Sequence, residues 1–325
     1  MLELKYPLFD GEKVWEGAAV TVENGLIVSV TACDPSECGE GFLMPGLIDA
    51  HTHMGTQAQV EAMLRSGITA TCDVSASREL VESSKQLEIV SSAGMAMGMV
   101  MNPKGYVEKA VANGARYIKV LLFNALSIGK PALRGIVKAA HEKGLKVAVH
   151  ATEIATVRQA VDAGADILLH VPMKEAFPEE LAKTIAQKGI TMAPTLAMME
   201  AFVKSGQFGY KETDYPNAEA AVQLLHDCGV TILAATDANS ATYVPAVGYG
   251  DTLHYEMELL AKAGLTPKEA LAAATSRSAD AFGLNAGRIA PGQPATMLFV
   301  DGRPDLRITD SSKIRKIWVK GEWIL

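Results

Sequence analysis

The chain has 325 residues, of which 49% are hydrophobic and 21% are charged, enough apolar material for one domain of about 250 residues beside a smaller one. The net charge is −7 and no segment concentrates lysine and arginine, which argues against a nucleic-acid partner and against an anionic membrane. No uninterrupted apolar run reaches the roughly 18 residues of a membrane span, and the first residues lack the apolar core of a signal peptide. We therefore expect a soluble cytoplasmic protein with no membrane partner.

The four cysteines do not form a recognisable motif. They are Cys33, Cys38, Cys72 and Cys228, with no CxxC pair and a chain too long for a small disulfide scaffold. Cys33 and Cys38 could chelate a metal ion as a pair, but two thiolates alone do not complete a tetrahedral site. Buried or idle thiols are the expected state.

Both ends of the chain show β-hairpin patterns. The run "AAVTVENGLIVSVTA" places an Asn24-Gly25 turn between two β-prone stretches, and "IRKIWVKGEWIL" repeats strand, Lys-Gly turn and strand near the C-terminus. Neither end has enough apolar surface to fold well alone. We predict that residues 1–40 and 285–325 together form one small β-sandwich domain beside the main domain.

The middle of the chain alternates short apolar runs with amphipathic helical stretches. The apolar runs occupy 42–51, 68–74, 96–101, 116–123, 145–150, 166–170, 190–194 and 230–236. Several are apolar at consecutive positions, which is typical of strands covered on both faces in a parallel sheet. The helical stretches 131–144 and 153–165 carry Gly at or near their ends, as C-caps do. Eight such units predict an α/β fold, a (β/α)8 TIM barrel spanning residues 41–284.

Two features of the barrel region need separate expectations. The segment 195–229 reads as a long connection between strands seven and eight, and long connections in compact domains often act as lids or binding loops. Methionines cluster at 95–101 and 192–199, and we expect both clusters to fill the core near strands three and seven.

Six polar side chains fall at or near the C-terminal ends of the predicted strands, the face on which barrel enzymes build active sites. They are His51, His53, Lys119, His150, His170 and Asp237. His51 and His53 alternate with Thr52, so both imidazoles can face one ion. Neutral imidazoles and an aspartate are suitable ligands for zinc and similar ions.

Lys119 does not fit this ligand set as an ordinary lysine, because an ammonium group has no lone pair. Two interpretations stay open at this point. Either burial deprotonates the amine and CO2 converts it to a carbamate that bridges two ions, or Lys119 is an ordinary lysine that extends its charge to solvent or pairs with an acid.

The ordered set resembles the amidohydrolase superfamily over about residues 40–325. The motifs that carry the resemblance are "PGLIDAHTH", "YIKV", "VAVHA", "ILLH", "AATDA" and the C-terminal "GLTPKEALAAATSRSADAFGLNAGRIAPGQPATMLFVD". The branch it is most similar to is imidazolonepropionase-like and Xaa-Pro dipeptidase-like. Ala235 stands where that branch usually has Gly, and Tyr249-Gly250 stands where it often has His-Gly.

The resemblance implies a barrel holding two divalent metal ions, with zinc as the default and Mn2+, Co2+ or Fe2+ as alternatives. His51, His53 and Asp237 would bind the first ion, His150 and His170 the second, and a carbamate on Lys119 would bridge them. The implied activity is hydrolysis of an amide, ester or lactone bond of a small molecule (a dipeptide, N-acyl amino acid or cyclic amide) by a metal-bridging hydroxide. Asp237 would act as the catalytic proton carrier. Relatives also make a homo-oligomer plausible.

Substrate selectivity should come from the loops that follow the strands. The candidate substrate residues are Asn124, Tyr210, Tyr243 and His254. Asp49 could support a ligand histidine or cap a turn. The helical residues His141 and His226 are expected to lie outside the site.

Two other functions are weighed. A mononuclear deaminase of the same superfamily would use an HxxE motif after strand five, and His150 and Glu153 have that spacing. A non-catalytic barrel would have no reason to keep six polar residues at strand ends. Metal content separates the hydrolase from the deaminase: about two ions per chain favour the hydrolase, and one ion favours the deaminase.

Overall fold

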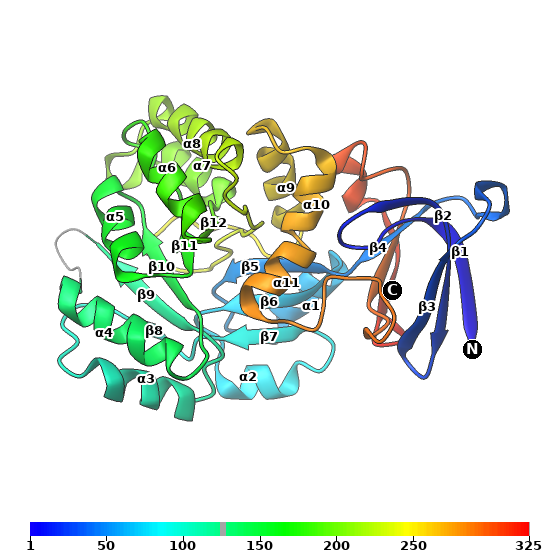
Figure 1. Ribbon diagram of the computed structural model, residues 1–325, viewed down its shortest axis with the longest axis horizontal. Helices are drawn as coiled ribbons and strands as arrows, with labels where there is room; N and C mark the ends of the chain where they lie inside the picture. The colour runs from blue at the N-terminus through cyan, green and yellow to red at the C-terminus, as the bar shows by residue number, and fades with distance from the viewer. Residues whose placement is uncertain (124–127, 325) are drawn as a thin grey trace.

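A computed structural model describes residues 1–123 and 128–324 of the chain. Strands from both ends build one seven-stranded sheet with the order β15-β14-β13-β4-β1-β2-β3. Its members are β1 (Leu2–Phe9), β2 (Val14–Glu23), β3 (Leu26–Ala32), β4 (Phe42–Pro45), β13 (Met297–Val300), β14 (Ile314–Val319) and β15 (Glu322–Trp323). Figure 1 shows both termini at this end of the molecule. The predicted association of the two chain ends is thus present in the hydrogen bonding.

The two predicted hairpin turns have the backbone that such turns require. Asn24 and Gly25 adopt φ values of 51° and 77° between β2 and β3, and Lys320 and Gly321 adopt 52° and 88° between β14 and β15. Left-handed positions favour Asn and Gly because these residues tolerate positive φ. The sheet also contains β4, which pairs with β1 and β13 and leads directly into the next sheet.

The remaining strands form two parallel sheets, which confirms the α/β class. One sheet contains β5 (Leu47–Thr52), β6 (Ile68–Asp73) and β7 (Glu88–Ser91). The other contains β8 (Met95–Ala96), β9 (Ile118–Leu122), β10 (Val147–Ala151), β11 (Ile167–Leu169) and β12 (Thr191–Ala193). The accompanying helices are α1 (Gln57–Arg65), α2 (Arg78–Ser83), α3 (Pro103–Ala112), α4 (Lys130–His141), α5 (Ile154–Ala163), α6 (Glu179–Gln187), α7 (Leu196–Ser205), α8 (Tyr215–Asp227), α9 (Thr252–Lys262), α10 (Pro267–Ala273) and α11 (Ser276–Phe282).

The segment 230–238 lies between the two parallel sheets. Ile232 forms a parallel bridge with Met192 of β12, and Ala238 forms one with Thr52 of β5. The amide of Ala50 in β5 also donates to the carbonyl of Ala234 at 3.0 Å. The prediction of a regular strand over 230–236 is wrong in detail, because this stretch makes only isolated bridges. The segment nevertheless links both sheets through its backbone.

Apolar side chains from the two sheets share one cluster, which contains Ile48, Ala70, Val90, Ala148 and Leu169, together with Leu233 and Ala235. Lys119 in β9 follows Tyr117, the residue just before this strand, by two positions, and His150 in β10 follows Ala148 by two. Because alternate strand residues face the same side, these two polar side chains face the interior that the cluster occupies.

The third apolar run behaves differently from its prediction. Of the run 96–101, only Ala96 lies in a strand, β8, and the strand Glu88–Ser91 was not predicted. Gly98 has a φ of 64°, so the extended chain turns out before α3 begins. Met97, Met99 and Met101 are accordingly exposed by 54%, 85% and 84%, which contradicts the expected core role. The methionines at 192, 198 and 199 are buried as predicted.

The predicted long connection 195–229 is mostly helical. It contains α7 and α8, and two short 3-10 turns lie between them, at Gln207–Gly209 and Glu212–Asp214. The irregular part is thus limited to about residues 206–214. Within the described parts of the chain, no helix is long and apolar enough to cross a bilayer.

Candidate metal centre

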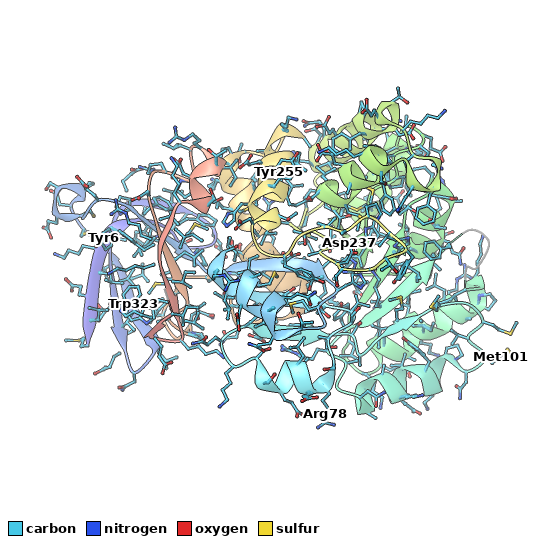
Figure 2. The ribbon with its side chains drawn as sticks, turned by 180° about the vertical axis from the view of Figure 1, so that it is seen from behind. Tyr6, Arg78, Met101, Asp237, Tyr255 and Trp323 are labelled. Atoms are coloured by element: carbon cyan, nitrogen blue, oxygen red, sulfur yellow. The ribbon has the colours of Figure 1, made fainter. Side chains whose placement is uncertain are left out.

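The structure brings the six predicted ligand residues to one place. Asp237 is central, with Oδ1 at 3.2 Å from Nε2 of His51 and 3.1 Å from Nε2 of His53. Its Oδ2 lies 4.0 Å from Nδ1 of His170. Figure 2 shows Asp237 on the yellow segment between the blue strands and the green strands.

Lys119 and His150 complete the cluster on the side of β9 and β10. Nζ of Lys119 lies 3.2 Å from Nε2 of His51, and the ring centroids of His150 and His170 are 4.4 Å apart. Residues separated by more than a hundred positions therefore meet because parallel strands end at a common edge.

The donor set fits a metal site. One ligand atom each from His51, His170 and Asp237 lie within 4.8 Å of one another. Among the described residues, Nε2 of His150 and Nδ1 of His51 are buried without any hydrogen-bond partner. A buried polar atom without a partner is costly, so an ion that accepts an imidazole lone pair would satisfy the orphaned nitrogen of His150.

Burial tunes the protonation of the cluster toward ligand chemistry. It lowers the pKa of His51 and of His150 to about 3, with the Lys119 charge as the next cause, so both imidazoles are neutral at pH 7. Burial also lowers the pKa of Lys119 to about 7, partly opposed by Asp237. Burial alone would raise the pKa of Asp237, but His51 and His53 outweigh it and hold that pKa well below its usual range. Neutral nitrogens beside a carboxylate are the state that binds cations.

Three residues at the site have left-handed backbone conformations. The φ values are 69° for His170, 53° for Thr195 and 57° for Asp237. Such conformations cost about 1–3 kcal/mol each for residues other than glycine and cluster at functional sites. Here they turn the chain sharply at strand ends, which aims His170 and Asp237 into the cluster.

Hydroxyl groups hold the rings of two predicted ligands. Oγ of Ser75 lies 3.0 Å from Nδ1 of His53, and Oγ1 of Thr195 lies 2.8 Å from Nδ1 of His170. Partners of this kind fix the orientation of a metal-binding ring. Sequence reasoning did not identify either residue; the only signal was that each follows a strand by two residues.

Two buried acidic side chains hold the backbone of the segments next to these hydroxyl groups. Asp73 accepts hydrogen bonds from the backbone of Met54, Ser75 and Ala76 at 2.5–2.8 Å, and so shapes the turn that carries Ser75. Glu256 of α9 accepts from the backbone amides of Leu196 and Ala197 at 2.9 and 2.7 Å. It thereby fixes the start of α7 next to Thr195.

Asp49 is a backbone clamp, because its carboxylate accepts from the amides of His51 and Thr236 and from the Thr236 hydroxyl. It does not contact the ring of a ligand histidine in these bonds. Tyr249, the departure from the superfamily pattern, donates its hydroxyl to the carbonyl of His53 at 2.5 Å. The position is therefore tied to the site.

The four candidate substrate residues are distributed differently. Tyr210 is half-buried, hydrogen-bonds Thr152 beyond β10 and lies under the ammonium of Lys174 at 4.6 Å. Tyr243 is 75% exposed. His254 does not join the cluster, since both of its ring nitrogens bond to Ser311 and Ser66 in the packing around α9. Asn124 lies outside the described residues.

Phe123 is a site residue that sequence reasoning missed. Its ring packs against His150 at a centroid distance of 4.9 Å and stays 41% exposed. It directly follows β9, which was the available signal. His141 and His226 lie elsewhere, as predicted. The structure pairs them with Asp166 and Glu269, respectively.

The amidohydrolase family model matches residues 42–324 of this chain. The chain belongs to the amidohydrolase family. One protein of similar sequence is ochratoxinase of Aspergillus niger, which is 25% identical over 239 residues. The match covers 66% of this chain and 48% of that protein. The imidazolonepropionase of Paracoccus denitrificans is 29% identical over 178 residues, covering 54% and 40%. The chain thus spans about half the length of these relatives or less.

Solved structures show the same family fold over the whole chain. A Xaa-Pro dipeptidase with bound methionine has a TM-score of 0.80 at 18% identity, covering 99% of this chain and 98% of that one. The structure of A. niger ochratoxinase has a TM-score of 0.82 at 19% identity, covering 99% and 94%. At these identities the likeness concerns the fold alone.

Proposed function

We propose that this amidohydrolase-family chain is a metal-dependent hydrolase that cleaves an amide, ester or lactone bond of a small molecule. The observation that carries the proposal is the convergence of His51, His53, His170 and Asp237 on one buried point, with Lys119 beside them. A structural role would leave no reason for the unpartnered Nε2 of His150. The family match supports the same conclusion.

We infer a centre for two divalent ions. His51, His53 and Asp237 would hold the first ion, His150 and His170 the second, and Lys119 would join them as a carbamate. Burial favours the neutral amine of Lys119, which is the form that reacts with CO2. A neutral lysine alone would leave the site without the anionic bridge that two cations need.

In hydrolysis, the bound ions and Asp237 would have different roles. Bound divalent ions lower the pKa of water toward neutrality and polarise a carbonyl oxygen. Asp237 lies at hydrogen-bond distance from both histidines of the HxH motif and reaches the centre of the cluster. From there its carboxylate takes the proton of the attacking water and delivers it to the leaving group, which an amine requires.

We also propose an architecture for the chain. We infer that the two parallel sheets and segment 230–238 form one barrel with eight strand positions, because 230–238 bonds to both sheets and their side chains share one interior cluster. The short strands β7 and β8 would share one position, since β7 pairs with β6 and β8 pairs with β9. The seven-stranded sheet would fold over its own core as a small sandwich, since Ile27 of β3 also exchanges backbone hydrogen bonds with Gly292 and Gln293, which lie outside the strands. The predicted domains are 1–40 with 285–325, and 41–284. Because β4 (Phe42–Pro45) belongs to the seven-stranded sheet, we place the first boundary after Pro45.

An amide substrate is the class that we favour. One of the similar structures is named a Xaa-Pro dipeptidase, and a dipeptidase cleaves a peptide bond. In this chain the exposed ring of Phe123 beside His150, and the half-buried Tyr210 beside Thr152, offer apolar surface beyond the ends of β9 and β10. We therefore expect substrates with an apolar group next to the scissile carbonyl.

The test is a metal count combined with a hydrolysis screen. Protein supplied with bicarbonate and zinc, manganese or cobalt should bind two ions per chain, and 13C-labelled bicarbonate should give a carbamate signal that Lys119→Ala abolishes. The screen covers aminoacyl-proline dipeptides, N-acyl amino acids, cyclic amides, lactones and aryl esters. A single tightly bound ion and ammonia release from aminated rings would instead favour the deaminase, which His150 and Glu153 keep open.

A further inference from the structure

Two cysteines lie side by side at the far end of the molecule from the metal cluster. Cys33 and Cys38 flank the 3-10 turn Pro35–Glu37 between β3 and β4, and their sulfur atoms are 3.7 Å apart. Figure 1 shows β1, β2 and β3 at the end opposite β9–β12. Both thiols are half-exposed and both are free.

The turn between the two cysteines is built to hold them together. The carboxylate of Asp34 accepts from the amide and the hydroxyl of Ser36 at 2.9 and 2.8 Å. The amide of Cys38 donates to the carbonyl of Pro35 at 3.1 Å. These bonds close a rigid turn whose two ends carry the thiols, so little chain entropy remains to be lost when the sulfurs react.

The turn also needs a glycine beneath it. A Cβ at Gly17 of β2 would lie 2.7 Å from the carbonyl oxygen of Cys33 and 3.2 Å from Sγ of Cys38. The amide of Cys33 donates to the carbonyl of Gly17 at 3.1 Å, so the turn sits directly on this residue. Any larger residue at position 17 would push one sulfur away from the other.

The remaining cysteines are placed for other roles. Cys72 is buried in β6, within the interior apolar cluster, and Cys228 follows α8. Only for Cys33 and Cys38, among the described residues, does the structure give a sulfur-to-sulfur contact.

We propose that Cys33 and Cys38 form a reversible dithiol–disulfide site that exchanges with small-molecule disulfides. In the first step, the thiolate of one cysteine attacks a sulfur of the small disulfide, which releases one small thiol and leaves a mixed disulfide. The second cysteine then attacks the protein sulfur of the mixed disulfide and releases the second small thiol. The protein loses two protons and two electrons, and the small disulfide gains them.

The new bond would join the end of β3 to the connection that enters β4. The bond would close only the short loop between positions 33 and 38, so it would restrict the unfolded chain locally and raise resistance to unfolding modestly. The metal cluster lies on other elements, so metal binding should not change.

The experiment equilibrates the full-length protein in oxidising and reducing glutathione buffers that contain a chelator. In the oxidising buffer we expect two of the four thiols to disappear, the mass to fall by about 2 Da per chain, and a peptide map to link Cys33 with Cys38. The reducing buffer should restore four thiols, and the oxidised form should melt at the higher temperature.

Matched variants decide the assignment. Cys228→Ser should still lose two thiols, whereas Cys33→Ser and Cys38→Ser should each end as a glutathione adduct with no internal disulfide. Gly17→Ala should form the bond more slowly. The proposal fails if the native protein keeps four thiols in buffers that oxidise a reference dithiol. It also fails if the map links other cysteines, or if the thiols are protected without loss of mass, as a bound soft metal ion would protect them.

Discussion

The carboxylate of Asp49 accepts two hydrogen bonds from Thr236, one from its amide at 3.0 Å and one from its hydroxyl at 2.6 Å. The pair joins β5 to segment 230–238, across 187 positions of sequence. Thr236 immediately precedes Asp237, and Asp49 also accepts from the amide of His51. One buried carboxylate therefore sets the spacing between two predicted ligands.

Replacement of Asp49 by Asn should lower the free energy of unfolding by about 2–3 kcal/mol, because an amide group cannot accept at both positions and leaves a buried donor unpaired. Urea denaturation of the metal-free protein measures this loss. Asp162→Asn is the control, since Asp162 is exposed on α5 and should change stability by less than about 0.5 kcal/mol. Equal effects of the two substitutions would contradict the clamp.

Asp237→Asn should reduce turnover by about 100-fold or more, the usual range for loss of a proton carrier. The substitution keeps the shape of the side chain, so metal content should fall less than activity. Steady-state kinetics on the best substrate of the screen, with metal analysis of the same sample, is the measurement. Near-native turnover in this variant would remove Asp237 from the proton-transfer role.

Ser75→Ala and Thr195→Val should each weaken metal binding by about 10–100-fold, since each removes the hydroxyl that orients a ligand ring. Competition with a chromophoric chelator gives the affinities. Ser83→Ala at the end of α2 removes a hydroxyl away from the cluster and should leave the affinity unchanged. If Thr195→Val binds metal as tightly as the native protein does, the contact between Thr195 and His170 has no positioning role.

Glu256 should make stability fall as pH rises through the neutral range. Burial raises its pKa in the folded protein to about 8, from 4.5 in an ordinary setting. Between these values the folded state holds a proton that the unfolded state has lost, so the unfolding free energy decreases with pH, by at most about 5 kcal/mol. Below pH 4.5 this contribution is fully present.

The substitution Glu256→Gln should flatten that pH dependence, because glutamine does not ionise. The measurement is the denaturation midpoint at pH values from 5 to 8.5, in steps of about 0.5. Glu258→Gln on the same helix is the matched control and should retain the native slope. An unchanged slope in Glu256→Gln would show that other groups cause it.

Gly250→Ala should destabilise the protein by about 3 kcal/mol, from backbone strain and from overlap. Gly250 has a φ of 85°, and a Cβ there would lie 2.6 Å from Oγ of Ser66 and 2.7 Å from the carbonyl oxygen of Ala62. Gly229 has the same φ of 85° with nothing within 4 Å. Gly229→Ala should therefore show the strain alone, about 1–2 kcal/mol. Thermal denaturation of both variants separates the two contributions.

The strength of sequence prediction depended on how much of each signal was local. Hairpins around Asn24-Gly25 and Lys320-Gly321, and helices such as α4 and α5, follow from turn chemistry and from helical periodicity, and the structure confirms them. The strand prediction for 96–101 was wrong. Its methionines give the segment the hydrophobicity of a buried strand, but the chain turns at Gly98 and exposes them to solvent.

The amino-acid sequence by itself determined the alternation of strands and helices, the six polar residues at strand ends and the family motifs around them. Only the tertiary structure decided that Ser75, Thr195 and Tyr249 hold the site, that His254 does not reach it, and that Cys33 and Cys38 touch. The reason is physical: strand periodicity and capping act over a few neighbouring residues, whereas a hydrogen bond between distant segments depends on where whole strands are packed, which no local pattern encodes.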